Sequence, residues 1–155
     1  MSNVRFIGLD VHKDSIVMSV AETGTAEAKV LGTFPNDINK VIKQFKKLSA
    51  DVSLLRVCYE AGPTGFGLYR RLKEAGIDCI VVAPSLVPQK AGLRVKTDRR
   101  DSKKLAHYLR SGDLTQVWVP DEQTEALRDL ERTRDDAKNA ERTARHQLSK
   151  FLLRN

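Results

Sequence analysis

Two apolar runs, each closed by an acidic residue, limit most strongly how this chain can fold. The run at residues 4–9 ends at Asp10, and the run at residues 54–59 ends at Glu60. Apolar runs of this length are typical of buried strands, and strands that alternate with helices pair in parallel. The carboxyl ends of such strands meet at one edge of an open sheet, where ligands usually bind. We therefore expect the carboxylates of Asp10 and Glu60 to lie close together.

The order of the expected elements is β-β-β-α-β-α-β, followed by further helices. Strands are expected at residues 4–10, 15–22, 27–34, 54–60 and 77–83. Apolar side chains predict helices at residues 38–48 and 68–76, and a capping Thr97 and a terminating Gly112 predict a helix at residues 98–111. Tight turns join the first three strands, which indicates an antiparallel meander. The pattern predicts an α/β fold whose mixed sheet has three antiparallel strands in front and parallel strands behind.

Positive charge is concentrated in residues 1–120. The chain has 27 Lys and Arg against 20 Asp and Glu, and residues 121–155 hold equal numbers of both signs. Within residues 84–110, eight basic side chains accompany only two acids. Such a group is either a solvated helix face or a phosphate-binding surface. We favour binding of nucleic-acid phosphates, because neutralising them releases counterions. The expected nucleic-acid-binding residues are Lys13, Lys90, Arg94, Lys96, Arg99, Arg100, Lys103 and Lys104.

Four carboxylates are the candidate catalytic and metal-binding groups: Asp10, Glu60, Asp98 and Asp101. The last two are three residues apart on a predicted helix, so their Cβ atoms are about 5–6 Å apart on one face. Two-metal phosphoryl transfer uses cations about 3.5–4 Å apart. Hard cations require oxygen ligands, so we expect Mg²⁺ or Mn²⁺. Each acid alone has an ordinary structural explanation, and their expected convergence is what favours a metal site.

Other site types fit the sequence poorly. Residues 62–67 have the glycine spacing of a phosphate loop but lack its Lys and its Ser or Thr. The three histidines have no mutual spacing suited to zinc, and Cys58 and Cys79 form no CxxC pair. Both cysteines lie in apolar runs, as buried thiols of a reducing compartment do. Without a signal-like or membrane-spanning stretch, the chain is expected to be cytoplasmic.

Residues 121–155 contain neither Gly nor Pro. A helix of this length would extend roughly 52 Å, far more than the domain at residues 1–120 needs. Its heptad positions are apolar at both ends and small or polar in the middle, which makes a mediocre coiled-coil seam. Two interpretations stay open. The helix pairs with another copy or with further chain, which would make the protein a homo-oligomer, or it is a solvated linker.

Three ordered motifs resemble the N-terminal domain of the DEDD-type transposases of bacterial insertion sequences, the IS-one-ten family. The motifs are FIGLDVHKD at residues 6–14, YEAGPTG at 59–65 and KTDRRDS at 96–102. Pilin-gene DNA invertases are related to that family. The resemblance covers essentially the whole chain and implies a RuvC-like, ribonuclease-H-like fold. It also implies that the four acids bind metal for DNA strand cleavage or transfer in transposition or site-specific inversion.

The resemblance implies further parts of the machinery. Family members have a second, C-terminal domain that supplies a serine thought to act as nucleophile, and some use a structured RNA to choose DNA sites. We therefore expect residues 1–155 to be the RuvC-like half of a recombinase. Two alternatives from other classes are a catalytically silent nucleic-acid-binding or dimerisation module and a fragment of an actin-like or sugar-kinase ATPase.

Overall fold

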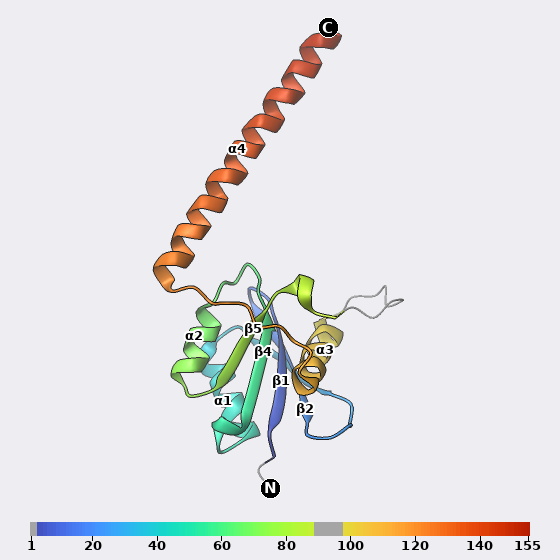
Figure 1. The fold of residues 1–155 in the computed structure, drawn as a ribbon, viewed down its shortest axis with the longest axis vertical. Coiled ribbons are helices and arrows are strands. Elements are labelled where there is room, and N and C mark those ends of the chain that lie inside the picture. Colours follow the sequence, from blue (N-terminus) through green and yellow to red (C-terminus); the bar gives the residue numbers. More distant parts are fainter. Residues whose placement is uncertain (1–2, 89–97) are drawn as a thin grey trace. The chain divides into compact units, whose positions relative to one another are not determined.

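The computed structural model describes residues 3–88 and 98–155, and a five-stranded sheet lies at the centre of these residues (Figure 1). The strands are β1 (Arg5–Val11), β2 (Ser15–Glu22), β3 (Lys29–Pro35), β4 (Leu55–Glu60) and β5 (Asp78–Val82). Their order across the sheet is β3-β2-β1-β4-β5. β1, β2 and β3 are antiparallel neighbours, whereas β4 runs parallel to both β1 and β5.

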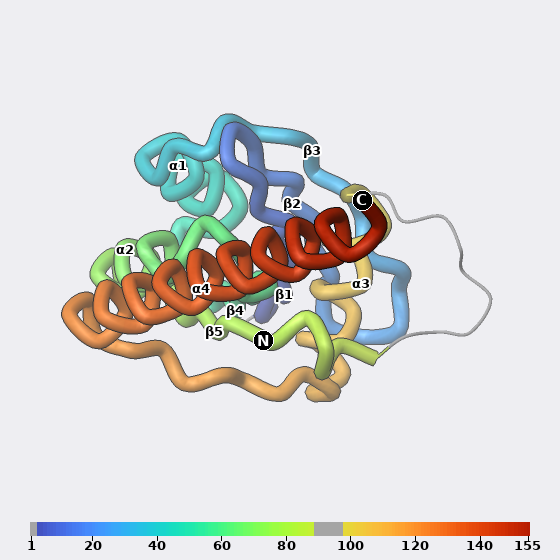
Figure 2. Tube along the Cα trace, turned by 90° about the horizontal axis from the view of Figure 1, so that it is seen from above, coloured from blue at the N-terminus to red at the C-terminus, as the bar shows by residue number. Residues whose placement is uncertain are grey.

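The helices α1 (Ile38–Leu48), α2 (Gly67–Glu74) and α3 (Asp98–Ser111) cover the two faces of this sheet. The described residues also form the long helix α4 (Glu122–Arg154) and the short 3-10 helices η1 (Val52–Leu54) and η2 (Pro84–Leu86). α1 and α2 lie on one face and α3 lies alone on the other (Figures 1 and 2). Asp37 caps the N-terminus of α1, because its carboxylate accepts the backbone N–H groups of Asn39 and Lys40.

The mixed sheet predicted from the sequence is confirmed, and its strand order and directions are those of the ribonuclease-H-like fold. The start of the third strand differs from the prediction: the strand begins at Lys29, and Glu27 lies outside it and pairs with Lys103. The segment before residue 120 is an extended return in which Gln116 makes a single antiparallel bridge to Val82.

Side chains of the central strands alternate between the two helical layers. On β4, the Tyr59 hydroxyl accepts the backbone N–H of Tyr69 in α2, so odd-numbered residues face α1 and α2. The Cys58 thiol donates to the Leu105 carbonyl of α3 at 3.5 Å, so even-numbered residues face α3. Glu60 therefore belongs to the α3 face.

The two cysteines are free thiols inside this core. Burial raises the pKa of both, that of Cys79 to about 12, so neither thiol forms a reactive thiolate near neutral pH. The chain separates into two compact units, Met1–Trp118 and Val119–Asn155. None of the helices in the described ranges combines the length and the apolar character that crossing a bilayer requires.

Candidate metal centre at the carboxyl edge of the sheet

α3 packs directly on the backbone of β1, and Gly8 makes this approach possible. A Cβ atom at Gly8 would overlap the Ser102 carbonyl oxygen and the Ala106 amide nitrogen, and it would lie 2.8 Å from Leu105 Cβ. No other residue type fits at Gly8 without displacing α3. The glycine thus determines how closely α3, and the acids in its first turn, approach the sheet.

A buried hydroxyl pair anchors α3 on the neighbouring strand. Ser19 on β2 and Ser102 on α3 are both fully buried, and their Oγ atoms are 2.8 Å apart. The Ser102 hydroxyl also donates to the Arg99 carbonyl at 3.2 Å, so Ser19 supplies the proton between the two serines. Ser102 is therefore a structural residue, and it fixes the distance between the start of α3 and the sheet.

Asp10 and Glu60 lie at corresponding points of β1 and β4. The register of this parallel pair runs from Arg5 with Leu55 to Leu9 with Tyr59, and Asp10 and Glu60 come directly after that last pair. Asp10 has the same parity as Gly8, so both acids belong to the α3 face. The predicted convergence of these two strand-terminal carboxylates at one edge of the sheet agrees with this register.

The first turn of α3 brings two more carboxylates to that edge. Asp98 precedes the buried Ser102 by four residues, and Asp101 precedes the buried Leu105 by four residues. Residues four apart share one face of a helix, so both acids extend the sheet-facing stripe of α3 beyond the packed core. The helix N-terminus carries a partial positive charge that favours the ionised form of acids placed there.

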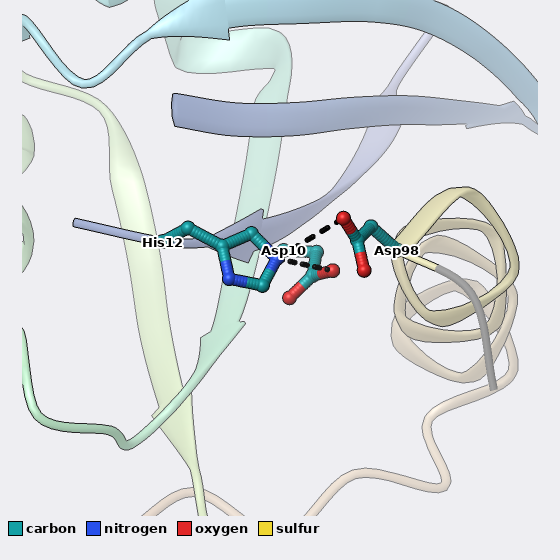
Figure 3. Close-up of side chains that lie close together, drawn as sticks. All are labelled: Asp10, His12 and Asp98. Carbon is teal, nitrogen blue, oxygen red and sulfur yellow. Dashed lines mark hydrogen bonds and ion pairs between the residues drawn. The ribbon is translucent and has the colours of Figure 1, made fainter. Parts of the chain in front are cut away.

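A tight group of three side chains forms where these elements meet (Figure 3). The Nε2 atom of His12 lies 3.2 Å from Asp10 Oδ2 and 3.4 Å from Asp98 Oδ2. One ligand atom from each side chain lies within 4.8 Å of the other two. Among residues 3–88 and 98–155, this is the one group of three or more His, Cys, Asp or Glu with such geometry, and it does not include Glu60 or Asp101.

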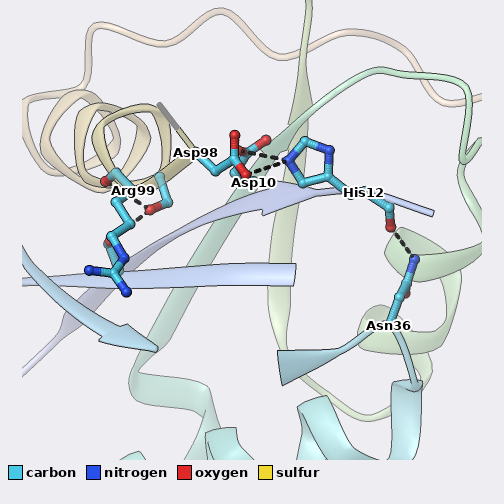
Figure 4. A network of polar contacts seen from close by, with 7 residues as sticks. Asp10, His12, Asn36, Asp98 and Arg99 are labelled. Atoms are coloured by element: carbon cyan, nitrogen blue, oxygen red, sulfur yellow. Dashed lines mark hydrogen bonds and ion pairs between the residues drawn. The ribbon is translucent and has the colours of Figure 1, made fainter. Parts of the chain in front are cut away.

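His12 was missed by the sequence analysis, which considered the histidines only as partners of one another. The His12 side chain lies on the same side of the sheet as that of Asp10, because His12 follows Asp10 by two residues and side chains of an extended chain return to the same side every second residue. The turn is held firmly: His12 donates its backbone N–H to Ser15, and Asn36 Nδ2 donates to the His12 carbonyl at 2.8 Å (Figure 4). His12 is thus a fixed nitrogen donor beside two carboxylates.

The charge of this group is only partly compensated. Burial raises the pKa of Asp10, and the negative charges of Asp98 and Asp101 raise it further, while the hydrogen-bonded His12 lowers it. The influence of Asp101 on this pKa means that its carboxylate lies near the group without joining it. Clustered carboxylates are stabilised by a divalent cation, which supplies the missing positive charge.

The raised pKa of Asp10 predicts that Asp10→Asn stabilises the metal-free protein. The folded protein binds this proton more tightly than the unfolded chain, so stability falls as pH rises through the folded pKa. In EDTA at pH 7 we expect the variant to melt higher by at most about 2–4 °C, the shift that 1 kcal/mol gives in a chain of this size. Near pH 3.5 the difference should vanish. A lower melting temperature of the variant at pH 7 would contradict this account.

Of the predicted nucleic-acid-binding residues, five lie in the described ranges. Lys13 is exposed in the turn after β1, and Arg99 is exposed at the start of α3, where its side chain points away from the carboxylates in Figure 4. Arg100, Lys103 and Lys104 line a surface cavity of about 440 Å³ together with His107 and Glu27. Lys103 is already paired there, because its Nζ lies 2.7 Å from Glu27 Oε1.

The remaining three predicted contacts, Lys90, Arg94 and Lys96, lie outside the described residues. Arg110, which contributed to the basic group in the sequence, has a structural role. Its guanidinium donates to the carbonyls of Glu22 and Ala26 and contacts His107 Nδ1 at 3.1 Å. Arg110 thus ties the β2–β3 connection to α3.

Sequence comparison identifies the family to which this chain belongs. The family model described as Transposase, for the DEDD transposases of IS110 elements, matches residues 7–154. The chain belongs to the IS110 transposase family. A similar protein is y4qE of Sinorhizobium fredii, named as a candidate transposase, which is 47% identical over 96% of this chain. The transposase for insertion sequence element IS1533 of Leptospira borgpetersenii is 37% identical over the same share. The chain spans 38% and 43% of these two transposases.

Two solved structures resemble this transposase-family chain more distantly. The large terminase nuclease from the thermophilic phage G20c is 20% identical, with a TM-score of 0.44 over 79% of this chain and 61% of the nuclease. RuvC of T. thermophilus, solved with a Holliday junction substrate, is 12% identical, with a TM-score of 0.45 over 74% of this chain and 99% of RuvC. Membership of the transposase family rests on the sequence matches.

Proposed function

We propose that this domain performs divalent-metal-dependent DNA strand cleavage or transfer during transposition. The observation that carries the proposal is the meeting of Asp10, His12 and Asp98 at the carboxyl edge of β1 and β4. Glu60 lies on β4 at the position that corresponds to Asp10 on β1, on the same face of the sheet. Asp101 is close enough to affect the pKa of Asp10. We assign the activity to residues 1–120, and a connecting or pairing role to residues 121–155.

The combination of carboxylate oxygens and one imidazole nitrogen suits a divalent cation that accepts both kinds of ligand. We assign Asp10, Glu60, Asp98 and Asp101 as oxygen ligands, as Mg²⁺ and Mn²⁺ require. The imidazole nitrogen of His12 favours Mn²⁺ over Mg²⁺, because imidazole suits transition metals better than hard cations. A cation held there would polarise a phosphoryl oxygen and activate the attacking oxygen. The carboxylates would position that cation, and two of them come from the first turn of α3.

Basic side chains beside the carboxylates would bind the DNA backbone. Lys13 follows His12 directly, and Arg100 and Lys104 line the cavity on α3. Phosphate contacts of this kind position DNA without reading its sequence. Family relatives extend well beyond the matched segment, so choice of target, an RNA partner and a serine nucleophile would come from the whole protein. Action on DNA would place that protein in the cytoplasm.

Plasmid nicking tests the proposed activity. Supercoiled DNA should convert to open circles when it is incubated with the 155-residue chain and about 1–10 mM Mn²⁺, because metal concentrations of this order saturate weak carboxylate sites. EDTA should abolish the conversion, and Mg²⁺ should support it less well. If purified protein never nicks DNA with either metal, alone or joined to the rest of a family transposase, the proposal fails.

The pairing of Lys103 with Glu27 yields a separate prediction for DNA binding. Glu27→Gln removes the negative charge that holds the Lys103 ammonium and makes this ammonium more available to a phosphate, so we expect DNA affinity at low salt to rise about two- to threefold, with a steeper salt dependence. Fluorescence anisotropy with a short duplex measures both. Glu22→Gln removes the same charge from the same connection without releasing Lys103, and it should change affinity less. Equal effects of the two substitutions would exclude a role for Lys103.

A further inference from the structure

α4 leaves large apolar side chains in solvent. Leu127 and Leu130 near its start, and Leu148, Phe151, Leu152 and Leu153 near its end, are between 59% and 86% exposed, and no α4 residue is buried. Apart from Leu153, they share one face of the helix at heptad-type spacing. Exposed apolar patches of this kind mark interaction surfaces.

The seam on this face is symmetric about its midpoint. Positions 127, 130, 134, 137, 141, 144, 148 and 151 hold Leu, Leu, Arg, Ala, Glu, Ala, Leu and Phe, and each position has a counterpart at equal distance from residue 139. In an antiparallel pair of identical helices centred there, Leu127 would face Phe151 of the second copy. Leu130 would face Leu148 of the second copy. Apolar side chains would then meet apolar side chains in all four outer layers.

The inner layers also match in this arrangement. Arg134 would face Ala144 of the second copy, and Glu141 would face Ala137 of the second copy, so each long polar side chain lies opposite a small one. The adjoining layers bring Arg134 near Glu141 of the second copy. Within one helix these two residues are seven positions apart and do not meet, and Glu141 instead pairs with Arg145 at 2.7 Å.

Charge also favours the antiparallel direction. Residues 121–136 carry seven acidic and three basic side chains, whereas residues 137–155 carry one acidic and five basic side chains. A parallel pair would place like charge beside like charge along its whole length. An antiparallel pair places the acidic half of one helix beside the basic half of the other. Glu131, which flanks the seam, would then lie beside Arg145 of the second copy, and this pair would occur twice in the dimer.

We propose that α4 is a self-association helix that pairs antiparallel with α4 of a second copy, centred on Asn139. A two-fold interface requires a surface that is complementary to itself, and the seam and the charge pattern of α4 both have this property. A helix evolved to meet a different segment has no reason to be self-complementary about its own midpoint. The inference is independent of the proposed catalysis.

Charge reversal tests the pairing and its direction. We expect the 155-residue chain to dimerise in sedimentation equilibrium, and Glu131→Arg or Arg145→Glu alone to weaken dimerisation about tenfold through repeated like-charge contacts. The double variant E131R/R145E should restore dimerisation to within about threefold, because the attractive pairs re-form. The two residues are fourteen positions apart in one helix, so no intrahelical contact can produce that rescue. Circular dichroism checks that helix content is unchanged in each variant.

Disulfide trapping tests the register. A mixture of Leu127→Cys and Phe151→Cys chains should form a cross-linked heterodimer, whereas neither variant alone should cross-link, because identical positions lie about 36 Å apart along an antiparallel pair. The native thiols are buried and do not compete. Self-cross-linking of Leu127→Cys would indicate a parallel pair and overturn the proposal. A chain that stays monomeric at 100 µM, roughly a hundred times a micromolar Kd, would also overturn it.

Discussion

Gly8→Ala is expected to destabilise the domain by about 2–3 kcal/mol, because overpacking a rigid contact forces backbone shifts. The added methyl group would overlap backbone atoms of Ser102 and Ala106, which cannot rotate away as a side chain can. The Ser19–Ser102 hydrogen bond, buried beside this contact, would lengthen as α3 moves outward. The melting temperature should fall by roughly 5–10 °C.

Gly67→Ala is the matched control for this substitution. No atom lies within 4 Å of a Cβ added at Gly67, which is the first residue of α2, so the variant should be as stable as the unchanged chain. Because α3 carries Asp98 and Asp101, the Gly8 variant should also lose metal affinity even at temperatures where it stays folded. Equal melting temperatures for the Gly8 variant and the unchanged chain would show that α3 does not pack on β1 as described.

Asp10→Asn and Asp98→Asn should each lower metal-dependent DNA nicking by about 10²–10⁴-fold, since a bound cation contributes several kcal/mol of transition-state stabilisation. These acids flank His12 in the tight group, and each substitution keeps the shape of the side chain while removing its charge. Asp101 and Glu60 do not belong to that group, so Asp101→Asn and Glu60→Gln should have smaller but clear effects. The measurement is the nicking rate at saturating Mn²⁺.

DNA binding separates a catalytic loss from general damage. The Asp98→Asn variant should bind DNA at least as well as the unchanged chain, because it removes a negative charge beside the phosphates. Asp129→Asn removes a charge of the same type on α4 and should leave nicking unchanged. Full nicking activity in the Asp98 variant would rule out the Asp98 carboxylate as a metal ligand. DNA binding without nicking in the unchanged chain as well as in the variants would favour a silent nucleic-acid-binding module.

His12 has a separable role beside the acids. If His12 contributes a nitrogen ligand, His12→Ala should weaken Mn²⁺ affinity more than Mg²⁺ affinity, because imidazole prefers the transition metal. Its turn is fixed by backbone and Asn36 contacts that the substitution leaves in place. The fold should therefore survive, and the variant reports on the site alone.

Much of this fold could be predicted from the sequence, because the spacing of apolar residues and the presence of turn-forming residues indicate strands and helices from short stretches of chain. The apolar runs that end at Asp10 and Glu60 specified two buried strands, and their shared direction placed both acids at one edge. Asp98 and Asp101 were found through their spacing on one helix. The same reasoning missed Gly8 as a contact point, because only the packed structure shows that α3 lies against it.

Side-chain partners that depend on distant segments were not predictable. His12 meets Asp98 only because the fold joins β1 to α3 across more than eighty residues. Lys103 was grouped with the phosphate-binding side chains, yet Glu27 pairs with it through a connection whose path the sequence pattern does not specify. Equally, the heptad pattern of α4 alone could not decide between a linker and a pairing helix.

Anomalous scattering from crystals soaked in Mn²⁺, with and without a short DNA duplex, tests the central claim most directly. We predict a peak in contact with Asp10 and Asp98 carboxylate oxygens, at about 2.1–2.3 Å, with Glu60 or Asp101 completing the site. An Asp98→Asn crystal soaked in the same way should lack it. Mn²⁺ bound only elsewhere, or no peak at this edge in the presence of DNA, would contradict a metal centre built from these acids.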